Sequence, residues 1–458
     1  MNTSLVSIKQ NDKGYITKFD SSLVRNELYP DLKKILGRNK WLSPRNKYLK
    51  NCIGQIGKDT KKSVFNGQVT DIAIYILASS FNHCMDGWTF LGRALDAQYR
   101  FDRATSIHLA YYAELRAAMS ILACSGIGVF NNKHLIVYYD NSKLNVHTIS
   151  QIQMNKTVTA TTHKACWALL DEWTRTEQCK QLLMGELAHD SITLGDWLSN
   201  LISARAIGQR WLKQWGVDLK RFAEMEDSTA RNEVSYRPSR LQPTNHVSIQ
   251  KNVDFISNFW QLCEPSGNTN YCLQAIDLQL LYSSLLILKK RKPSGYNAAV
   301  EKMILSVYNI NKDEILTNKK AALWQKQFVG LEESHLNSIV SYAKRKDSHT
   351  HADFPYQILS RAFLLLRMAT AGCQKIIKEA NINSNMLSFW WQPLAENSGL
   401  IDQSSYELGD TWQDVTEALS NIETSSTYNS TMQWRRENSN ALAILGECER
   451  VGLWGMGL

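Results

Sequence analysis

Residues 104–124 read ATSIHLAYYAELRAAMSILAC, and this stretch decides the fold class. Ile107, Tyr111, Leu115, Ala118 and Leu122 recur at steps of three and four residues, which places them on one face of a helix. Two glycines follow shortly after the stretch, as is typical of the end of a helix. The pattern therefore predicts a long helix with one buried side.

Helical periodicity recurs along most of the chain. The other segments that show it are residues 71–79, 163–173, 194–215, 271–290, 296–308, 320–342 and 355–371. Residues 128–150 differ, because short apolar runs alternate there with a turn signal at 140–142, which is typical of strands joined by a turn. The sequence predicts a mainly α protein, built of one or more multi-helix bundles with a small β-hairpin insertion.

Composition changes along the chain predict four parts. They are a basic N-terminal segment (1–64), a helical domain with the β insertion near 128–150 (65–227), a C-terminal helical domain (251–400) and an acidic tail with an apolar end (401–458). Residues 228–250 are polar and lack periodicity, so they are predicted to be a boundary or a long surface loop. Residues 381–398 are predicted to be irregular. The final GLWGMGL is predicted to fold back onto the core or to dock on a partner.

Charge is distributed unevenly over these parts. The net charge is +9, yet residues 1–62 alone hold 14 Lys and Arg against 5 Asp and Glu, and residues 400–458 hold 3 Arg against 9 Asp and Glu. Lys and Arg release counterions from a polyanion, so the basic segment is a candidate nucleic-acid contact. The candidate side chains are Lys33, Lys34, Arg38, Lys40, Arg45, Lys47 and Lys50. Alternatively, the basic segment forms a solvated face, or it contacts the acidic tail or a partner.

Several classes of protein lack support in the sequence. Nine scattered cysteines without a CxxC pair indicate reduced thiols. The N-terminus has no apolar leader, and no apolar stretch approaches the ~20 residues that span a bilayer, so a cytoplasmic protein without membrane contact is predicted. Walker A, complete dinucleotide-binding and GxSxG motifs are absent, and no cofactor is predicted.

The densest cluster of reactive groups lies in residues 345–372, which read RKDSHTHADFPYQILSRAFLLLRMATAG. Arg345, His349, His351 and Asp353 precede an apolar helix whose first turn suits Pro355. Backbone N–H groups at the start of a helix favour an anion such as a phosphate. The cluster is therefore the main candidate for a functional site.

Two interpretations of this cluster come from its chemistry alone. His349, His351 and Asp353 match part of the HxHxDH pattern of metallo-β-lactamase-like hydrolases, but no buried strand precedes them and Phe354 replaces the last histidine. In the structural interpretation, the two histidines cap the helix and pair with Asp347 or Asp353, while Arg345 lies on a solvated face.

A third interpretation comes from a family resemblance. Arg345, five intervening residues and His351 resemble the motif of HEPN-like helical proteins, whereas Arg345 and His349 lie too close together to match it. Lys346 departs from the polar uncharged residue that often follows the arginine. Residues 111–128 (YYAELRAAMSILACSGIG) also resemble the opening helix of some bacterial HEPN-type proteins.

The resemblance implies metal-independent RNA cleavage. Arg345 would then hold the phosphate and His351 would act in acid–base transfer, with His349 as a second histidine of the same loop. It also implies RNA rather than DNA as the partner, and a setting in defence against phages. Family members often place the site across a homodimer.

The alternative from another class is a non-catalytic subunit of a larger nucleic-acid-handling complex, docking through its basic N-terminus and its GLWGMGL end. An active site requires Arg345 and His351 to be exposed in a shared cleft. Glu114 and Arg116 are predicted to form a surface ion pair. Residues 289–292 (KKRK) are predicted to lie at a helix end, and Trp390 and Trp391 to be core.

Overall fold

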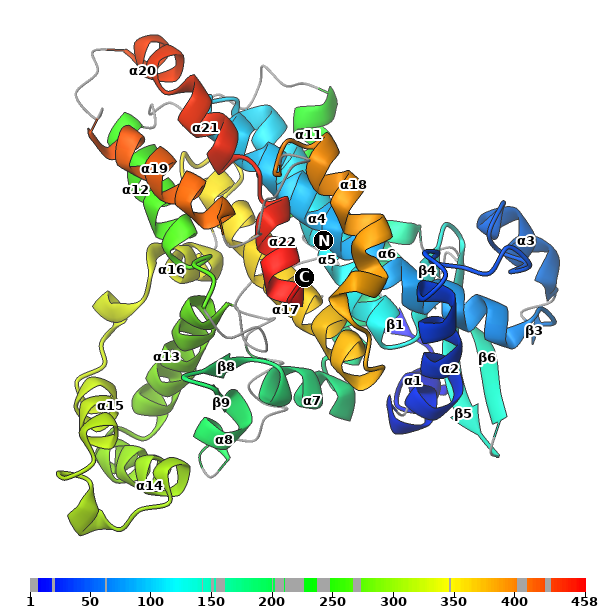
Figure 1. Ribbon diagram of the computed structural model, residues 1–458, viewed down its shortest axis with the longest axis horizontal. Helices are drawn as coiled ribbons and strands as arrows, with labels where there is room; N and C mark the ends of the chain where they lie inside the picture. The colour runs from blue at the N-terminus through cyan, green and yellow to red at the C-terminus, as the bar shows by residue number, and fades with distance from the viewer. Residues whose placement is uncertain are drawn as a thin grey trace.

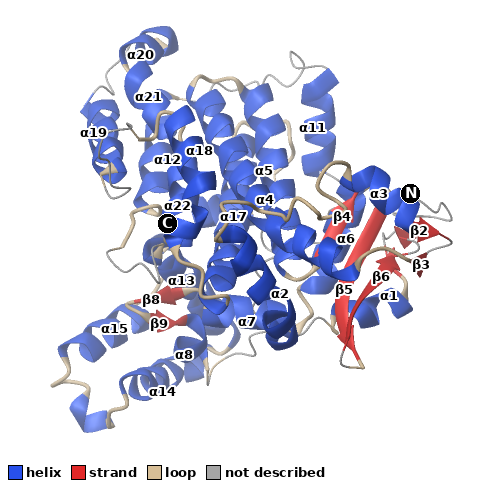
Figure 2. Ribbon diagram, turned by 45° about the vertical axis from the view of Figure 1, so that its right-hand side comes forward, coloured by secondary structure: helices blue, strands red, loops and turns tan. Residues whose placement is uncertain are grey.

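The computed structural model describes residues 7–18, 21–61, 64–141, 143–149, 152–153, 161–199, 201, 210, 226–236, 248–266, 273–345, 347–401, 410–424 and 430–458. Helices make up most of this part of the chain, and the strands are confined to small antiparallel sheets, as Figure 2 shows. The prediction of a mainly α fold is confirmed.

Three long helices form the centre of the molecule. They are α4 (Val69–Tyr99), α5 (Arg103–Cys124) and α17 (Phe354–Glu379). α4 and α5 form a hairpin across the short turn between Tyr99 and Arg103. The Asp102 side chain caps the start of α5 by accepting the Thr105 amide at 3.1 Å. The face of α5 that the sequence predicted to be inward is buried. α17 packs on both helices (Figure 1), so the core draws helices from both predicted helical domains.

The C-terminal helix α22 (Glu449–Met456) completes this core. It packs against α17 and α4, and its apolar side chains, Trp454 among them, are buried. Of the two predictions for the GLWGMGL end, folding back onto the core is the one confirmed. The docking role given to this end in the non-catalytic alternative is wrong, because its apolar side chains already face α4 and α17.

The predicted β insertion is a three-stranded antiparallel sheet. Its order is β4 (Ile127–Phe130), β5 (Lys133–Asp140) and β6 (Lys143–Ile149), with Ile127 opposite Ile136 and Val137 opposite Val146. The N-terminal helix α1 (Gln10–Ile16) and helix α6 (Thr162–Trp173) pack against it. The insertion is therefore one strand larger than a hairpin.

Shorter elements surround the core. The paired short strands are β1 (Ser7–Ile8) with β7 (Ile152–Gln153), β2 (Thr60–Lys61) with β3 (Val64–Phe65), and β8 (Ala188–His189) with β9 (Ile192–Thr193). The remaining α-helices are α2 (Ser21–Leu36), α3 (Cys52–Asp59), α7 (Glu177–Gly185), α8 (Leu194–Leu198), α11 (Glu226–Tyr236), α12 (Ile249–Gln261), α13 (Gln274–Arg291), α14 (Tyr296–Tyr308), α15 (Lys319–Val329), α16 (Ser338–Lys344), α18 (Ser388–Asn397), α19 (Thr411–Thr424), α20 (Thr431–Glu437) and α21 (Ser439–Leu445). α14 and α15 project from one corner of the molecule in both Figure 1 and Figure 2.

Three local predictions are wrong. Residues 228–236 belong to α11 rather than to a loop, whereas residues 237–247 lie outside the described part. The helix predicted over 320–342 is two helices, because α15 ends at Val329, with Gly330 as its C-cap, and Asn337 caps α16 through the Ile339 amide. Part of the segment predicted to be irregular is α18. Of the helix predicted over 194–215, the structure describes α8 and little more.

Most other predictions hold. KKRK lies at the end of α13. Trp390 and Trp391 are half-buried at the edge of the core and not inside it, and Trp390 packs edge-on against Trp41, with their ring centroids 5.1 Å apart. The described cysteines are buried or half-buried free thiols. Within the described ranges, the helices are all too short or too polar to cross a lipid bilayer.

Candidate functional site

The candidate loop comprises residue 345 and residues 347–353, which join α16 to α17. Arg345 adopts an extended conformation directly after α16, and the loop ends where α17 begins with Pro355 in its first turn, as predicted. Lys346 lies outside the described residues. The loop therefore sits at the positive, N-terminal end of the 26-residue α17.

Arg103 of α5 holds the loop in place. Its Nη2 donates to the carbonyls of His349 and His351 at 2.6 and 2.7 Å, and its Nη1 donates to the carbonyl of Ala352 at 3.0 Å. Burial lowers the pKa of Arg103 to about 10, so the guanidinium is charged at neutral pH. Three charge-assisted hydrogen bonds thus fix the backbone that carries both histidines.

Arg345 belongs to a group of charges. Its Nη1 lies 3.1 Å from Asp353 Oδ2, and its guanidinium lies 4.7 Å from the centre of the Tyr342 ring. Lys251 of α12 reaches the other oxygen of Asp353 at 2.5 Å. Because a guanidinium carries five N–H donors and Asp353 is shared with Lys251, Arg345 keeps donors for a further anion. Its side chain is 49% exposed.

His351 is exposed, and its ring is held on one side. The side chain is 53% exposed, Nδ1 accepts the Asp353 amide at 3.2 Å, and the same nitrogen lies 3.7 Å from Asp347 Oδ2. Among the described residues, Nε2 has no hydrogen-bond partner. The contact with the Asp353 amide is the helix-capping role of the structural interpretation, and it leaves the other ring nitrogen directed at solvent.

His349 is directed elsewhere. Its Nε2 lies 3.2 Å from Glu233 Oε2 of α11, and its ring packs edge-on against Phe354 with a centroid distance of 6.4 Å. The three predicted metal ligands are therefore engaged by different groups: His349 by Glu233, His351 by a backbone amide, and Asp353 by two cations. The described residues contain no group of three or more His, Cys, Asp and Glu that could hold a metal ion.

The prediction of a surface ion pair between Glu114 and Arg116 is wrong. Glu114 is 2% exposed and contacts Arg361 of α17, which also binds Asp227 of α11 at 2.6 Å. Arg116 pairs instead with Asp86 at 3.6 Å. Burial and the nearby Asp227 raise the pKa of Glu114. This cluster ties α5, α11 and α17 together.

The basic N-terminal candidates separate into two groups. Lys34, Arg38 and Lys40 line one cavity of about 270 Å³ beside α2, together with Asp31 and Asp71. The others do not join them: Lys47 pairs with Asp59 at 2.8 Å, Lys33 is half-buried on α2, and Arg45 and Lys50 are exposed on the segment that follows. The basic segment and the acidic helix α19 lie at opposite ends of the molecule in Figure 1 and Figure 2.

The sequence pattern identified the two ends of the candidate motif but not the residues that position them. Arg103, Glu233 and Lys251 lie about 250, 120 and 100 residues before the loop. Single charged residues at such separations carry no spacing signal. No protein-family model, curated protein or solved structure matches the chain. Its function therefore has to be argued from the geometry of this site.

Proposed function

We propose that the candidate loop binds RNA and cleaves it, with Arg345 on the phosphate and His351 transferring protons. The observation that carries the proposal is that two exposed side chains, an imidazole and a guanidinium, lie on one loop, both in contact with Asp353, and that Arg103 fixes the backbone of this loop. The N-terminus of α17 adds a favourable field for a phosphate at the same place.

The reaction needs only the RNA and these side chains. The 2′-OH gives its proton to His351 Nε2, its oxygen attacks the adjacent phosphorus, and the bond from phosphorus to the 5′-oxygen breaks. The leaving 5′-oxygen then takes the proton back from His351 Nε2, which yields a 2′,3′-cyclic phosphate and a free 5′-OH and returns the imidazole to its neutral form. Arg345 neutralises the charge that develops on the phosphoryl oxygens. DNA lacks the 2′-OH and would not react.

Asp347 has a positioning role in this scheme. When Nδ1 accepts the Asp353 amide, the proton of the neutral ring is on Nε2. The base form carries its proton on Nδ1 instead, and the negative charge of the Asp347 carboxylate, 3.7 Å from Nδ1, favours a proton there without a direct hydrogen bond. Asp347 is itself held by Gln357 of α17, whose Nε2 donates to Oδ2 at 2.7 Å.

The test is incubation of the purified protein with labelled RNA and with DNA of the same sequence, in the presence of EDTA. We expect RNA alone to be cut, and His351→Ala to lower the rate by about 100-fold or more, as is typical of the loss of an acid–base group. His335→Ala is a matched control, because His335 is also exposed and its Nδ1 also accepts a backbone amide. Equal cleavage by wild type and His351→Ala would refute the proposal.

A second candidate function is nucleic-acid binding without cleavage. It is favoured by the convergence of Lys34, Arg38 and Lys40 on one cavity. In a binding assay at several salt concentrations, Lys34→Glu with Arg38→Glu should weaken RNA binding and lower the salt dependence by about 0.7 for each phosphate of a single strand that the variant no longer neutralises. This function is supported if binding falls in that way while no RNA is cut by the wild type.

A further inference from the structure

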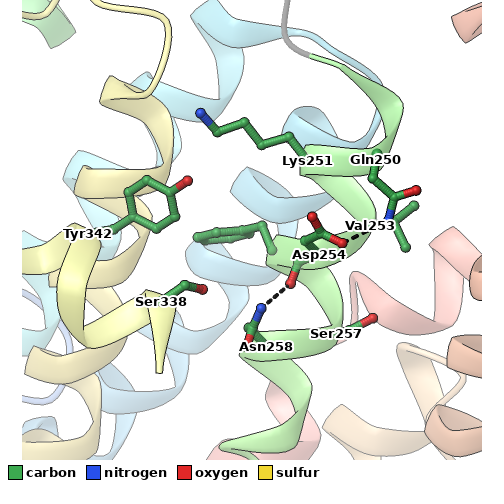
Figure 3. Close-up of a pocket in the computed structure, with 9 residues that line it drawn as sticks. Gln250, Lys251, Val253, Asp254, Ser257, Asn258, Ser338 and Tyr342 are labelled. Carbon is green, nitrogen blue, oxygen red and sulfur yellow. Dashed lines mark hydrogen bonds between the residues drawn. The ribbon is translucent and has the colours of Figure 1, made fainter. Parts of the chain in front are cut away.

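A cavity adjoins the candidate loop between α12 and α16. Its volume is about 590 Å³, within the ~300–1,000 Å³ typical of small-molecule sites. Figure 3 shows that α12 forms one wall and α16 the other, with Tyr342 and Ser338 projecting from α16 toward α12. The cavity is large enough for one nucleotide.

The α12 wall carries a row of hydrogen-bonding groups. Gln250 Nε2 donates to Asp254 Oδ1 at 2.8 Å, and Asn258 Nδ2 donates to the Asp254 carbonyl at 2.6 Å (Figure 3). The first bond orients the Asp254 carboxylate, whereas the second reaches only its backbone carbonyl. Gln250 is the only described partner of the carboxylate, so Oδ2 and the second lone pair of Oδ1 remain acceptors. A carboxylate accepts hydrogen bonds and donates none when ionised. This wall therefore favours a ligand that presents hydrogen-bond donors, such as the N–H groups of a base.

The α16 wall contributes an unsatisfied polar atom and an apolar surface. Ser338 Oγ is buried and has no hydrogen-bond partner among the described residues. Buried hydroxyls are normally paired, so an atom left unpaired at the edge of a cavity indicates a missing partner. Tyr342 and Phe255 pack edge-on with ring centroids 5.9 Å apart and supply an apolar surface for a planar group.

Two side chains that line the cavity also contact the candidate loop. Lys251 lines the cavity and pairs with Asp353, and Tyr342 lines it and carries the Arg345 guanidinium on its ring. A planar group between α12 and α16 would thus lie one side chain away from the proposed phosphate position at Arg345. The base and the phosphate of a single nucleotide are also close neighbours of this kind.

We infer that the cavity binds a guanine base of the RNA strand, with Asp254 accepting hydrogen bonds from the N1–H and the exocyclic amine. Guanine offers two adjacent donors on this edge, whereas uracil offers one and the amines of adenine and cytosine stand beside acceptors. The inference rests on the proposed function for its RNA strand, but the binding of the base does not depend on cleavage. It predicts that cleavage occurs next to guanosine.

The experiment measures the binding of 3′-GMP, 3′-AMP, 3′-CMP and 3′-UMP to the full chain by calorimetry. We expect 3′-GMP to bind most tightly and Asp254→Asn to weaken it by about tenfold, the usual effect of losing a bidentate contact to a base. The other three nucleotides should be little affected. Asp313→Asn, at an exposed aspartate after α14, is the matched control.

A second variant keeps the inference testable if Asp254→Asn does not fold. Ser338→Phe places a ring in the cavity without removing a charge, and it should abolish 3′-GMP binding while circular dichroism remains unchanged. Equal affinities for the four nucleotides in the wild type, or 3′-GMP binding that survives both Asp254→Asn and Ser338→Phe, would overturn the inference.

Other outcomes distinguish a failure of this inference from a failure of the proposed function, and the binding of an RNA strand from the binding of a free nucleotide. Guanine binding that depends on Asp254, in a protein that cuts no RNA, would refute the cleavage and leave the base site intact. Cleavage that depends on His351 but is indifferent to guanosine and to Asp254→Asn would refute the base site alone. If 3′-GMP binds but guanosine-containing and guanosine-free RNAs bind alike, the assignment to an RNA strand fails.

Discussion

At the scale of single residues, Arg103 has the clearest structural role. It is the first residue of α5, it is 8% exposed, and it gives its hydrogen bonds to three carbonyls of a loop almost 250 residues further along the chain. Backbone carbonyls that lose a charged donor are left poorly satisfied when they cannot reach water. The conformation of the loop therefore depends on a residue outside it.

Replacement of this side chain tests that dependence. Arg103→Met should lower the free energy of unfolding by about 2–3 kcal/mol, because it removes three charge-assisted hydrogen bonds at a site of low exposure. Urea denaturation followed by circular dichroism measures the change. Arg100→Met is the control, since Arg100 makes only an exposed pair with Asp96 and should change stability by less than about 0.5 kcal/mol. Similar losses in the two variants would contradict the role given to Arg103.

The residue scale also shows how far sequence could predict the candidate site. Arg345, His351 and Pro355 belong to one short segment, so their spacing identified the loop and the start of α17. Lys251, Glu233 and Arg103 come from three other helices, and only the tertiary structure brings them to the loop. Whether Arg345 and His351 are catalytic stays a prediction.

At the scale of elements, the fit of α22 against α4 depends on the absence of side chains. A β-carbon added to Gly452 would lie 2.6 Å from Trp88 Cδ1 and 2.9 Å from Met85 Sδ. Both neighbours are buried side chains of α4. The glycines of GLWGMGL thus allow the helix to approach more closely than any larger residue would permit.

Substitution of this glycine should therefore disturb the packing of the whole element. Gly452→Ala is expected to lower the free energy of unfolding by about 1–3 kcal/mol through overpacking. Gly57→Ala in α3 is a matched control, because nothing lies within 4 Å of its added β-carbon. There the alanine should stabilise the helix by up to about 1 kcal/mol. Thermal unfolding of both variants tests this expectation. If the Tm of both variants shifts in the same direction, the result would count against close packing at α22.

The long helix α5 was predictable from its apolar stripe, whereas the polar helix α11 was not. α5 has five inward positions at helical spacing, and all of them are buried. Among the side chains described for α11, those of residues 227–236, Ser228, Ala230 and Val234 are the buried ones. The helix is attached by polar contacts such as Asp227 with Arg361 and Arg231 over the Tyr111 ring. Periodicity reports apolar burial, so a helix held by ion pairs gives no such signal.

At the scale of the whole molecule, one buried ion pair links the projecting α13–α15 region to the core. Arg367 of α17 donates from Nε and Nη2 to Asp277 of α13 at 2.9 and 2.7 Å, and both residues are almost completely buried. Asp277 also accepts the Ala188 amide at 2.9 Å. Three parts of the chain therefore meet at a single carboxylate.

Loss of one partner should be far more damaging than loss of both. Asp277→Asn leaves Arg367 as an uncompensated buried charge and is expected to cost about 3–5 kcal/mol. The double variant Asp277→Leu with Arg367→Met should recover a large part of that loss, apart from the unpaired Ala188 amide. Urea unfolding of the double variant and of its two single variants, Asp277→Leu and Arg367→Met, completes a mutant cycle. A double variant as unstable as the sum of the singles would show that the pair has no coupling.

Because α17 lies far from α4 and α5 along the chain, the ribosome completes it long after the other two core helices. About 230 residues separate Cys124, where α5 ends, from Phe354, where α17 begins. A ribosome adding roughly 5–20 residues per second needs roughly 10–50 s to produce that stretch. The α4–α5 hairpin can form within microseconds of its emergence, yet the flank that α17 will cover stays in water throughout this interval. We therefore expect the growing chain, more than the finished protein, to be the form that depends on chaperones for protection from aggregation.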